Sequence, residues 1–243
     1  MRTFACENAL MATHAAQQDQ TDPWLPLYRL DVDTYNRLVE AGALEGVEVE
    51  LLEGLLINKG PHRQDTIHRL DVGTYERIVA SGVLEDRPIE LLEGLLVEVS
   101  PQGVEHARLI EELTIRLAGP GARPRVQLPL EVSFGSLPEP DLALIEGPPP
   151  SVRHPRTALL VVEVAVTSHR LDRGEKADMY AWAPVPVYWL VDVPGRAVEV
   201  RSEPGPRGYA RCEVYEVGGA QVPSPAEGVP ALDAAWLLDA LGD

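Results

Sequence analysis

Cysteine is scarce: this chain of 243 residues has two, Cys6 and Cys212. Neither lies in a CxxC or Cys/His neighbourhood, which argues against a structural zinc site and leaves a disulfide without support. The sequence also lacks an apolar stretch near the roughly 20 residues that a membrane-spanning helix needs. Met1–Gln20 has no sustained apolar run of the secretory kind, so we expect a soluble, cytoplasmic protein.

Basic residues are also few. The chain has 21 Lys and Arg against 38 Asp and Glu, which gives a formal net charge of −17. No stretch interleaves basic with aromatic residues, whereas nucleic-acid binding normally uses a basic footprint because phosphate neutralisation dominates the affinity. The composition therefore disfavours tight nonspecific DNA binding, although a metal ion can bring positive charge to a phosphodiester locally.

An internal repeat is the clearest organisational feature. Residues 28–57 and 68–97 align without a gap at an offset of 40, and 18 of the 30 aligned residues are identical. Solenoid folds need about three copies or more, and the later sequence does not continue the pattern. The repeat therefore indicates a partial duplication of one small unit.

Each copy predicts one helix followed by one hairpin. In the second copy, Tyr75, Ile78 and Val79 recur at helical spacing, and Gly82 provides a stop. Two short apolar runs then flank a Glu-Gly pair, which is typical of a tight hairpin. The turns expected on this basis are Glu53-Gly54 in the first copy and Glu93-Gly94 in the second.

The rest of the chain alternates short apolar strands with helices. Ala158–Val166 is a nearly continuous apolar run, which is typical of a strand buried on both faces. Residues 126–132 alternate apolar with other residues and predict a half-buried strand near an edge, because Pro129 cannot donate a ladder hydrogen bond. The other expected elements are helices at Glu105–Leu117, Arg173–Ala183 and Ala234–Leu241, and strands at Asp141–Ile145, Val187–Val193, Ala197–Arg201 and Tyr209–Val217.

This order of elements predicts an α/β fold of the mixed α+β kind, with a mixed central sheet flanked by helices. Residues 1–27 are polar, Gln-rich and without periodicity, so we expect a disordered tail. Residues 28–67 form the partial duplicate of the helix–hairpin unit. Residues 68–243 form the main domain.

Three ionisable residues stand out along the main domain, although each has an ordinary explanation by itself. Glu163 interrupts an apolar strand, where a carboxylate is costly to bury unless it is paired or bound to metal. Asp141 opens a strand after two prolines, which also suits a turn aspartate. Lys176 lies four residues after Asp172 at a helix start, as in an i, i+4 ion pair with a capping aspartate. Together they make two oxygen ligands and one cation, which suits a magnesium site.

Seven motifs in compact order resemble the Uma-two family of putative restriction endonucleases, within the PD-(D/E)XK nuclease superfamily. The resemblance runs from about His68 to Tyr215 and rests on Glu90-Leu91-Leu92-Glu93-Gly94, Ser100-Pro101, Glu105-His106-Ala107, Pro138-Glu139-Pro140-Asp141, Val162-Glu163-Val164, Asp172-Arg173-Gly174-Glu175-Lys176 and Tyr188-Trp189-Leu190-Val191-Asp192.

The resemblance implies a restriction-endonuclease-like core in which Asp141 and Glu163 are metal ligands. The superfamily lysine usually follows the second acid by two residues, where this chain has Ala165, and Lys176 on the next helix matches its relocated position. Glu90 matches an additional catalytic and metal-binding acid, with Glu93 as the alternative. His106 matches a family histidine, for which a structural role is favoured over a catalytic one.

This chain departs from the family pattern at Pro184 and Val187, which alter the turn after the lysine helix and could shift Lys176. The upstream partial copy is a further departure. Because that copy has no counterpart of Asp141, Glu163 or Lys176, it cannot form a second active site. It could pack against the core, exchange with the second copy, or stay loosely attached.

The leading hypothesis is an endonuclease that uses Mg²⁺ or Mn²⁺ to hydrolyse DNA, with Asp141, Glu163, Lys176 and Glu90 as its catalytic residues. The alternative is a catalytically silent binding or assembly module on the same fold, which the negative charge favours. Hydrolysis of another phosphate ester is a weaker third hypothesis. A homodimer is compatible with cutting both strands, although no residue requires one.

Overall fold

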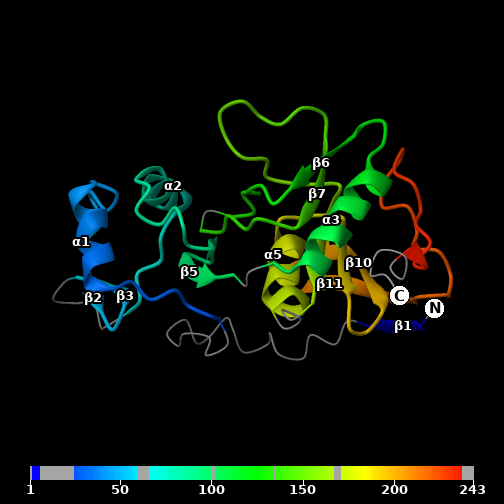
Figure 1. The fold of residues 1–243 in the computed structure, drawn as a ribbon, viewed down its shortest axis with the longest axis horizontal. Helices are drawn as coiled ribbons and strands as arrows, with labels where there is room; N and C mark the ends of the chain where they lie inside the picture. The colour runs from blue at the N-terminus through cyan, green and yellow to red at the C-terminus, as the bar shows by residue number, and fades with distance from the viewer. Residues whose placement is uncertain are drawn as a thin grey trace. The chain divides into compact units, whose positions relative to one another are not determined.

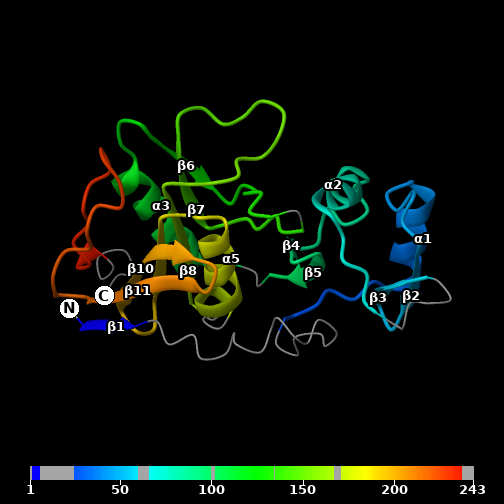
Figure 2. The same ribbon diagram turned by 180° about the vertical axis from the view of Figure 1, so that it is seen from behind.

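The computed structural model describes residues 2–5, 25–59, 66–99, 102–133, 135–166 and 171–236 (Figures 1 and 2). Contacts divide these residues into two compact units. The sheet unit contains residues 2–5, 102–132 and the described residues from 139 onward, and the repeat unit contains the two copies with residues 133–138. The two copies thus cluster together, and the domain boundary expected at residue 68 stays a prediction.

A mixed sheet forms the centre of the sheet unit. Its seven described strands lie in the order β1-β11-β10-β9-β8-β7-β6. Strands β8 and β9 pair in parallel, whereas every other neighbouring pair is antiparallel. The strands are β1 (Arg2–Ala5), β6 (Ala122–Val126), β7 (Leu142–Glu146), β8 (Leu160–Ala165), β9 (Val187–Asp192), β10 (Ala197–Gly205) and β11 (Gly208–Glu216).

Helices cover both faces of this sheet. Helix α3 (Val104–Leu117) packs on one face, and α5 (Ala177–Trp182), which continues from the π-helical turn η2 (Asp172–Lys176), packs on the other. Successive side chains of β8 alternate between the two cores, with Val162 and Val164 on the α3 side and Val161 and Ala165 on the α5 side. The expected α/β architecture and the strand buried on both faces are confirmed.

The edge strand differs from its expected position. The observed strand β6 ends at Val126, whereas alternation predicted a strand over 126–132. Gln127 has a positive φ of 49°, and its N–H donates to Pro140 O rather than continuing the ladder with β7. Pro129 has no N–H to offer a neighbouring strand, so the alternating segment after Val126 runs as irregular chain.

The structure also bears on the expectations for the two ends of the chain. Arg2–Ala5 lies within the stretch expected to be disordered but forms β1, which pairs antiparallel with β11. That pairing covers the main-chain groups at the edge of β11. Asp233 Oδ1 accepts the N–H of Ala235, as its capping role predicts, but residues 237–243 of the expected last helix lie outside the described residues. The described chain contains no helix that is both long and apolar enough to cross a membrane.

The repeat unit contains the same elements twice, at an offset of 40 residues. The first copy has α1 (Val32–Glu40), β2 (Val49–Leu52) and β3 (Leu55–Asn58), and the second has α2 (Val72–Ala80), β4 (Ile89–Leu92) and β5 (Leu95–Glu98). Both hairpins turn at a Glu-Gly pair in which each residue has a positive φ. The tight hairpin turn that the sequence predicts is thus of a kind that suits type I′, since both central residues of that turn need a positive φ.

Each repeat helix begins with an aspartate cap, and the second cap carries a stability prediction. Asp71 Oδ1 accepts the N–H of Thr74 at 2.8 Å, and this bond lowers the pKa of Asp71 below its usual value. We expect Asp71→Ala to lower the free energy of unfolding by about 1 kcal/mol at pH 7, while Asp71→Asn, which caps equally well, changes it little.

The effect of Asp71→Ala should depend on pH in a defined direction. A carboxylate whose pKa is depressed by folding stabilises the native state above its unfolded pKa and loses that contribution as pH falls through the folded pKa. The difference between the native protein and Asp71→Ala should therefore shrink below about pH 4. Urea unfolding of both proteins at pH 7 and pH 3 measures this difference in the free energy of unfolding. An equal difference at the two pH values would contradict the charged-cap explanation.

Candidate active site

Glu163 is the carboxylate at the centre of the site. It follows Val162 on β8, so strand alternation directs its side chain to the face covered by η2 and α5. Its side chain is 3% exposed, and Glu163 Oε1 accepts the hydroxyl of Tyr180 at 2.9 Å. The same oxygen lies 3.4 Å from Lys176 Nζ. A buried carboxylate thus meets a buried ammonium and a hydroxyl from one helical segment.

Asp141 lies against Glu163 at the start of β7. Asp141 N donates to Glu163 Oε2 at 3.4 Å, and Asp141 Oδ2 accepts the N–H of Val164 at 2.8 Å. These two bonds cross from β7 to β8 just beyond the Leu142–Val162 pair of the ladder. Pro138 and Pro140 favour extended backbone in the residues before Asp141, so the chain enters β7 along the strand direction. The two acids are therefore fixed next to each other by main-chain groups.

His106 completes the surroundings of Asp141 from the opposite helix. It lies in the first turns of α3, is buried, and places Nε2 at 3.0 Å from Asp141 Oδ2. Within the described chain, His106 Nδ1 is buried and has no hydrogen-bond partner. The arrangement suits an imidazole that donates from Nε2 to the carboxylate and so fixes the orientation of Asp141.

The π-helical turn that carries Lys176 is held by side chains from the sheet. The Tyr188 hydroxyl donates to Asp172 O at 2.7 Å, and Arg201 Nη1 donates to Arg173 O at 2.8 Å. Burial raises the pKa of Tyr188 well above its usual value, so this hydroxyl keeps its proton as a donor. π-helical turns are rare in proteins, and those that occur often lie at functional sites. Here the turn replaces the regular helix expected from Arg173 and delivers Lys176 to Glu163.

Arg173 anchors the outer side of the same turn. Its Nη2 lies 2.6 Å from Glu199 Oε1 on β10 and 3.1 Å from Asp192 Oδ2 on β9. The hydrogen bond with Glu199 is the largest cause that raises the pKa of the Arg173 guanidinium. The position of Lys176 thus depends on a network that spans two neighbouring strands.

Comparison with known protein families assigns this chain to one of them. The family model Uma2, described as "Putative restriction endonuclease", matches residues 72–237, which is more than half of the chain. The chain belongs to the Uma2 family. The matched region begins at the first residue of α2, so the first repeat copy lies outside it. The resemblance noted from the seven motifs is confirmed.

No curated protein matches the chain. Solved structures similar to it include the crystal structure of a putative nuclease belonging to DUF820 from Anabaena variabilis ATCC 29413. The two chains are 18% identical, the similarity covers 63% of this chain and 90% of that chain, and the TM-score is 0.49.

Three of the predicted site residues come together in this Uma2 protein. Asp141, Glu163 and Lys176 lie within one connected set of contacts, although 35 positions separate the first from the last. Ala165, at the usual lysine position of the superfamily, is buried in the core on the same side of β8 as Glu163. Lys176 from the following helix reaches the carboxylate instead, as the family resemblance implied.

Glu90 belongs to the other compact unit. It lies on β4, pairs with Val97 in the hairpin register, and is buried, whereas Glu93 is exposed at the turn. Its role as an additional acid stays a prediction. The Ser100-Pro101 motif lies outside the described residues.

The sequence did not reveal Tyr180 as a contributor to the site, nor the residue that His106 contacts. Tyr180 was not singled out, although its spacing of four residues from Lys176 places both on one side of a helix. His106 was assigned a structural role, and the structure brings it to a predicted metal ligand. The family motif Glu105-His106-Ala107 was the available signal for His106.

Proposed function

We propose that this Uma2 protein is a metal-dependent endonuclease that hydrolyses phosphodiester bonds in DNA. The observation that carries the proposal is the buried pair of acids, Asp141 and Glu163, in which the Asp141 main-chain N–H donates to the Glu163 carboxylate and the Lys176 ammonium lies against Glu163 Oε1. Membership of a family described as "Putative restriction endonuclease" supports a nuclease acting on DNA.

The residues present fit a divalent ion of the magnesium type. Within the described residues, no group of three or more His, Cys, Asp or Glu side chains is arranged to hold a metal. Mg²⁺ nevertheless needs only one or two protein carboxylates, because water and substrate phosphate complete its shell. The hydrogen bonds of Asp141 within the described chain use Oδ2 and its main-chain N–H, which leaves Oδ1 available as a ligand.

Asp141 and Glu163 would hold Mg²⁺ or Mn²⁺, with Glu90 as a further predicted ligand. When bound, the ion supplies positive charge to phosphate oxygens and lowers the pKa of water, which places positive charge locally in a chain whose net charge is −17. Lys176 orients the attacking water or offsets negative charge that develops on the phosphate. His106 fixes the orientation of Asp141, and Tyr180 fixes that of Glu163.

The decisive experiment is a cleavage assay with the full chain on supercoiled, linear and single-stranded DNA. We expect cleavage with Mg²⁺ or Mn²⁺ and none with a chelator. Calorimetric titration of each metal should be run on the same preparation. Metal binding without cleavage of any substrate would overturn the proposal in favour of a silent binding or assembly module, the candidate that the negative charge favours.

A further inference from the structure

The two repeat copies exchange the first part of their leading segments, whereas Leu30 N and Leu70 N donate to Gly54 O and Gly94 O of their own hairpins. Residues 25–28, which precede α1, pair with β5 of the second copy, and residues 66–68, which precede α2, pair with β3 of the first. Tyr28 N donates to Leu96 O at 2.8 Å and Glu98 N donates to Pro26 O at 2.8 Å. The counterparts, with each partner 40 residues away, are the bonds from His68 N to Leu56 O at 2.7 Å and from Asn58 N to Thr66 O at 3.1 Å.

This reciprocity is the signature of a twofold relation. In an isologous interface, residue i of one subunit contacts residue j of the other while j of the first contacts i of the second. The repeat unit meets that condition within one chain, since Leu27 bridges Val97 and Ile67 bridges Ile57. A repeat array that grows by stacking would instead offer different surfaces to its two neighbours.

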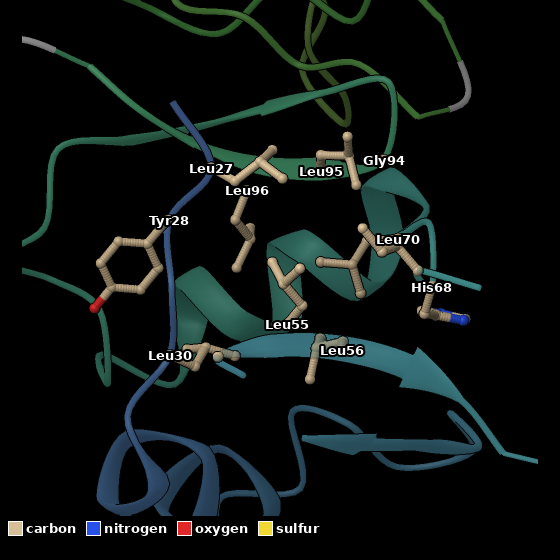
Figure 3. A pocket seen from close by; sticks show the side chains of 12 residues that line it. Leu27, Tyr28, Leu30, Leu55, Leu56, His68, Leu70, Gly94, Leu95 and Leu96 are labelled. Atoms are coloured by element: carbon tan, nitrogen blue, oxygen red, sulfur yellow. The ribbon is translucent and has the colours of Figure 1, made fainter. Parts of the chain in front are cut away.

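A small apolar cleft lies where the two copies meet. Its volume is about 30 Å³, which is room for one or two water molecules. The twelve lining residues form six pairs at an offset of 40: Leu27 with Ile67, Tyr28 with His68, Leu30 with Leu70, Gly54 with Gly94, Leu55 with Leu95 and Leu56 with Leu96. Figure 3 shows the leucines of β3 and β5 around the cleft, while Tyr28 and His68 point away on opposite sides.

The core of the repeat unit is shared in the same manner. One cluster of buried side chains takes Leu30, Leu38 and Leu56 from the first copy and Leu70, Ile78 and Leu96 from the second. A single copy without its partner would expose the apolar side of its hairpin together with an unpaired strand edge, which is a ready template for another chain.

We propose that the first copy occupies, within the chain, a self-association surface that the second copy would otherwise offer to another molecule of this protein. The surface consists of the β5 edge, the leading segment 66–68 and the leucines between them. Its partner is another helix–hairpin unit of the same kind, bound by reciprocal strand pairing. The proposal does not rest on the nuclease chemistry, because Asp141, Glu163 and Lys176 lie outside both copies and the surface does not use Glu90 of β4.

Disulfide trapping in the full chain tests whether the pairing closes within one molecule. Leu27 and Val97 form a non-hydrogen-bonded antiparallel pair, for which the Cα separation of about 4.5 Å suits a disulfide. In a background of Cys6→Ser and Cys212→Ser, Leu27→Cys with Val97→Cys, and separately Ile57→Cys with Ile67→Cys, should each oxidise to a monomeric product. Covalent dimers, or no disulfide from either pair, would overturn the proposal.

Releasing the first copy tests the surface itself. Tyr28→Pro removes the N–H that bonds Leu96 O, and Leu27→Asp puts a charge into the cleft, so this double variant should free β5. Sedimentation should show the unaltered chain as a monomer and the variant as a dimer. A variant that keeps the circular dichroism spectrum of the unaltered chain but stays monomeric would overturn the proposal.

A matched control separates strand exchange from general stickiness. Adding Ile67→Asp and His68→Pro to that variant removes the second leading segment as well, so reciprocal pairing has no donor in either copy. The fourfold variant should therefore sediment as a monomer. Association as strong as that of the first variant would show nonspecific apolar contact and overturn the proposal.

Discussion

Asp141→Asn is expected to reduce metal-dependent DNA cleavage by about 10²–10³-fold or more, because loss of one preorganised electrostatic partner at a reacting phosphate has effects of that size. The substitution keeps the shape of the side chain. The Asn carbonyl oxygen can still accept the Val164 N–H and the His106 ring, as Asp141 Oδ2 does. The change therefore removes the charge while it keeps the local geometry.

The control for Asp141→Asn should remove one acidic charge elsewhere. Glu216→Gln fits this purpose, since Glu216 lies exposed at the end of β11 in the same unit. Cleavage rates should be measured over a range of Mg²⁺ and Mn²⁺ concentrations, with calorimetry to follow metal binding. Full activity in Asp141→Asn at every metal concentration would remove Asp141 from the catalytic set, whereas equal losses in both variants would show only a general charge effect.

The second large effect concerns stability. Lys176→Met leaves the Glu163 carboxylate buried without the ammonium that lies 3.4 Å from it, and breaking a buried ion pair in this way costs about 3–5 kcal/mol. Adding Glu163→Gln removes the remaining charge, and the Gln carbonyl can still accept the Tyr180 hydroxyl. The double variant should therefore unfold at a higher urea concentration than Lys176→Met alone.

The same variants separate folding from catalysis. Both single variants and the double variant should be inactive, although the double variant regains much of the lost stability. A thermodynamic cycle from urea unfolding of the four proteins measures the coupling between the two side chains. Additive losses would mean that Lys176 and Glu163 do not interact in solution, and recovery of cleavage in the double variant would contradict their proposed roles.

The parts of the fold that depend on local patterns were predictable from the sequence. The apolar run around Glu163 identified a strand buried on both faces, and the Glu-Gly pairs marked both hairpin turns. The alternation after Val126 was misleading, since alternation alone cannot distinguish a paired strand from extended chain that lacks a neighbour. The ladder ends there because of the positive φ at Gln127, which the sequence did not signal.

The candidate site was predictable to the extent that motif order reveals it. Asp141, Glu163 and Lys176 were named together, and the structure brings them together. The contact of His106 with Asp141 depends on how α3 packs against the sheet, which no local pattern encodes. The exchange of leading segments was equally hidden, because a segment that pairs with its own hairpin and one that pairs with its neighbour's hairpin have the same sequence.

Because the copies pair reciprocally, an even number of helix–hairpin copies can pair completely within one chain, whereas an odd number cannot. Two copies satisfy each other and leave no open strand edge at their junction. One copy, or three, would leave a leading segment and a hairpin edge without a mate inside the chain. Gain or loss of a single 40-residue copy by recombination would therefore switch the protein between a self-contained molecule and one that must find a partner.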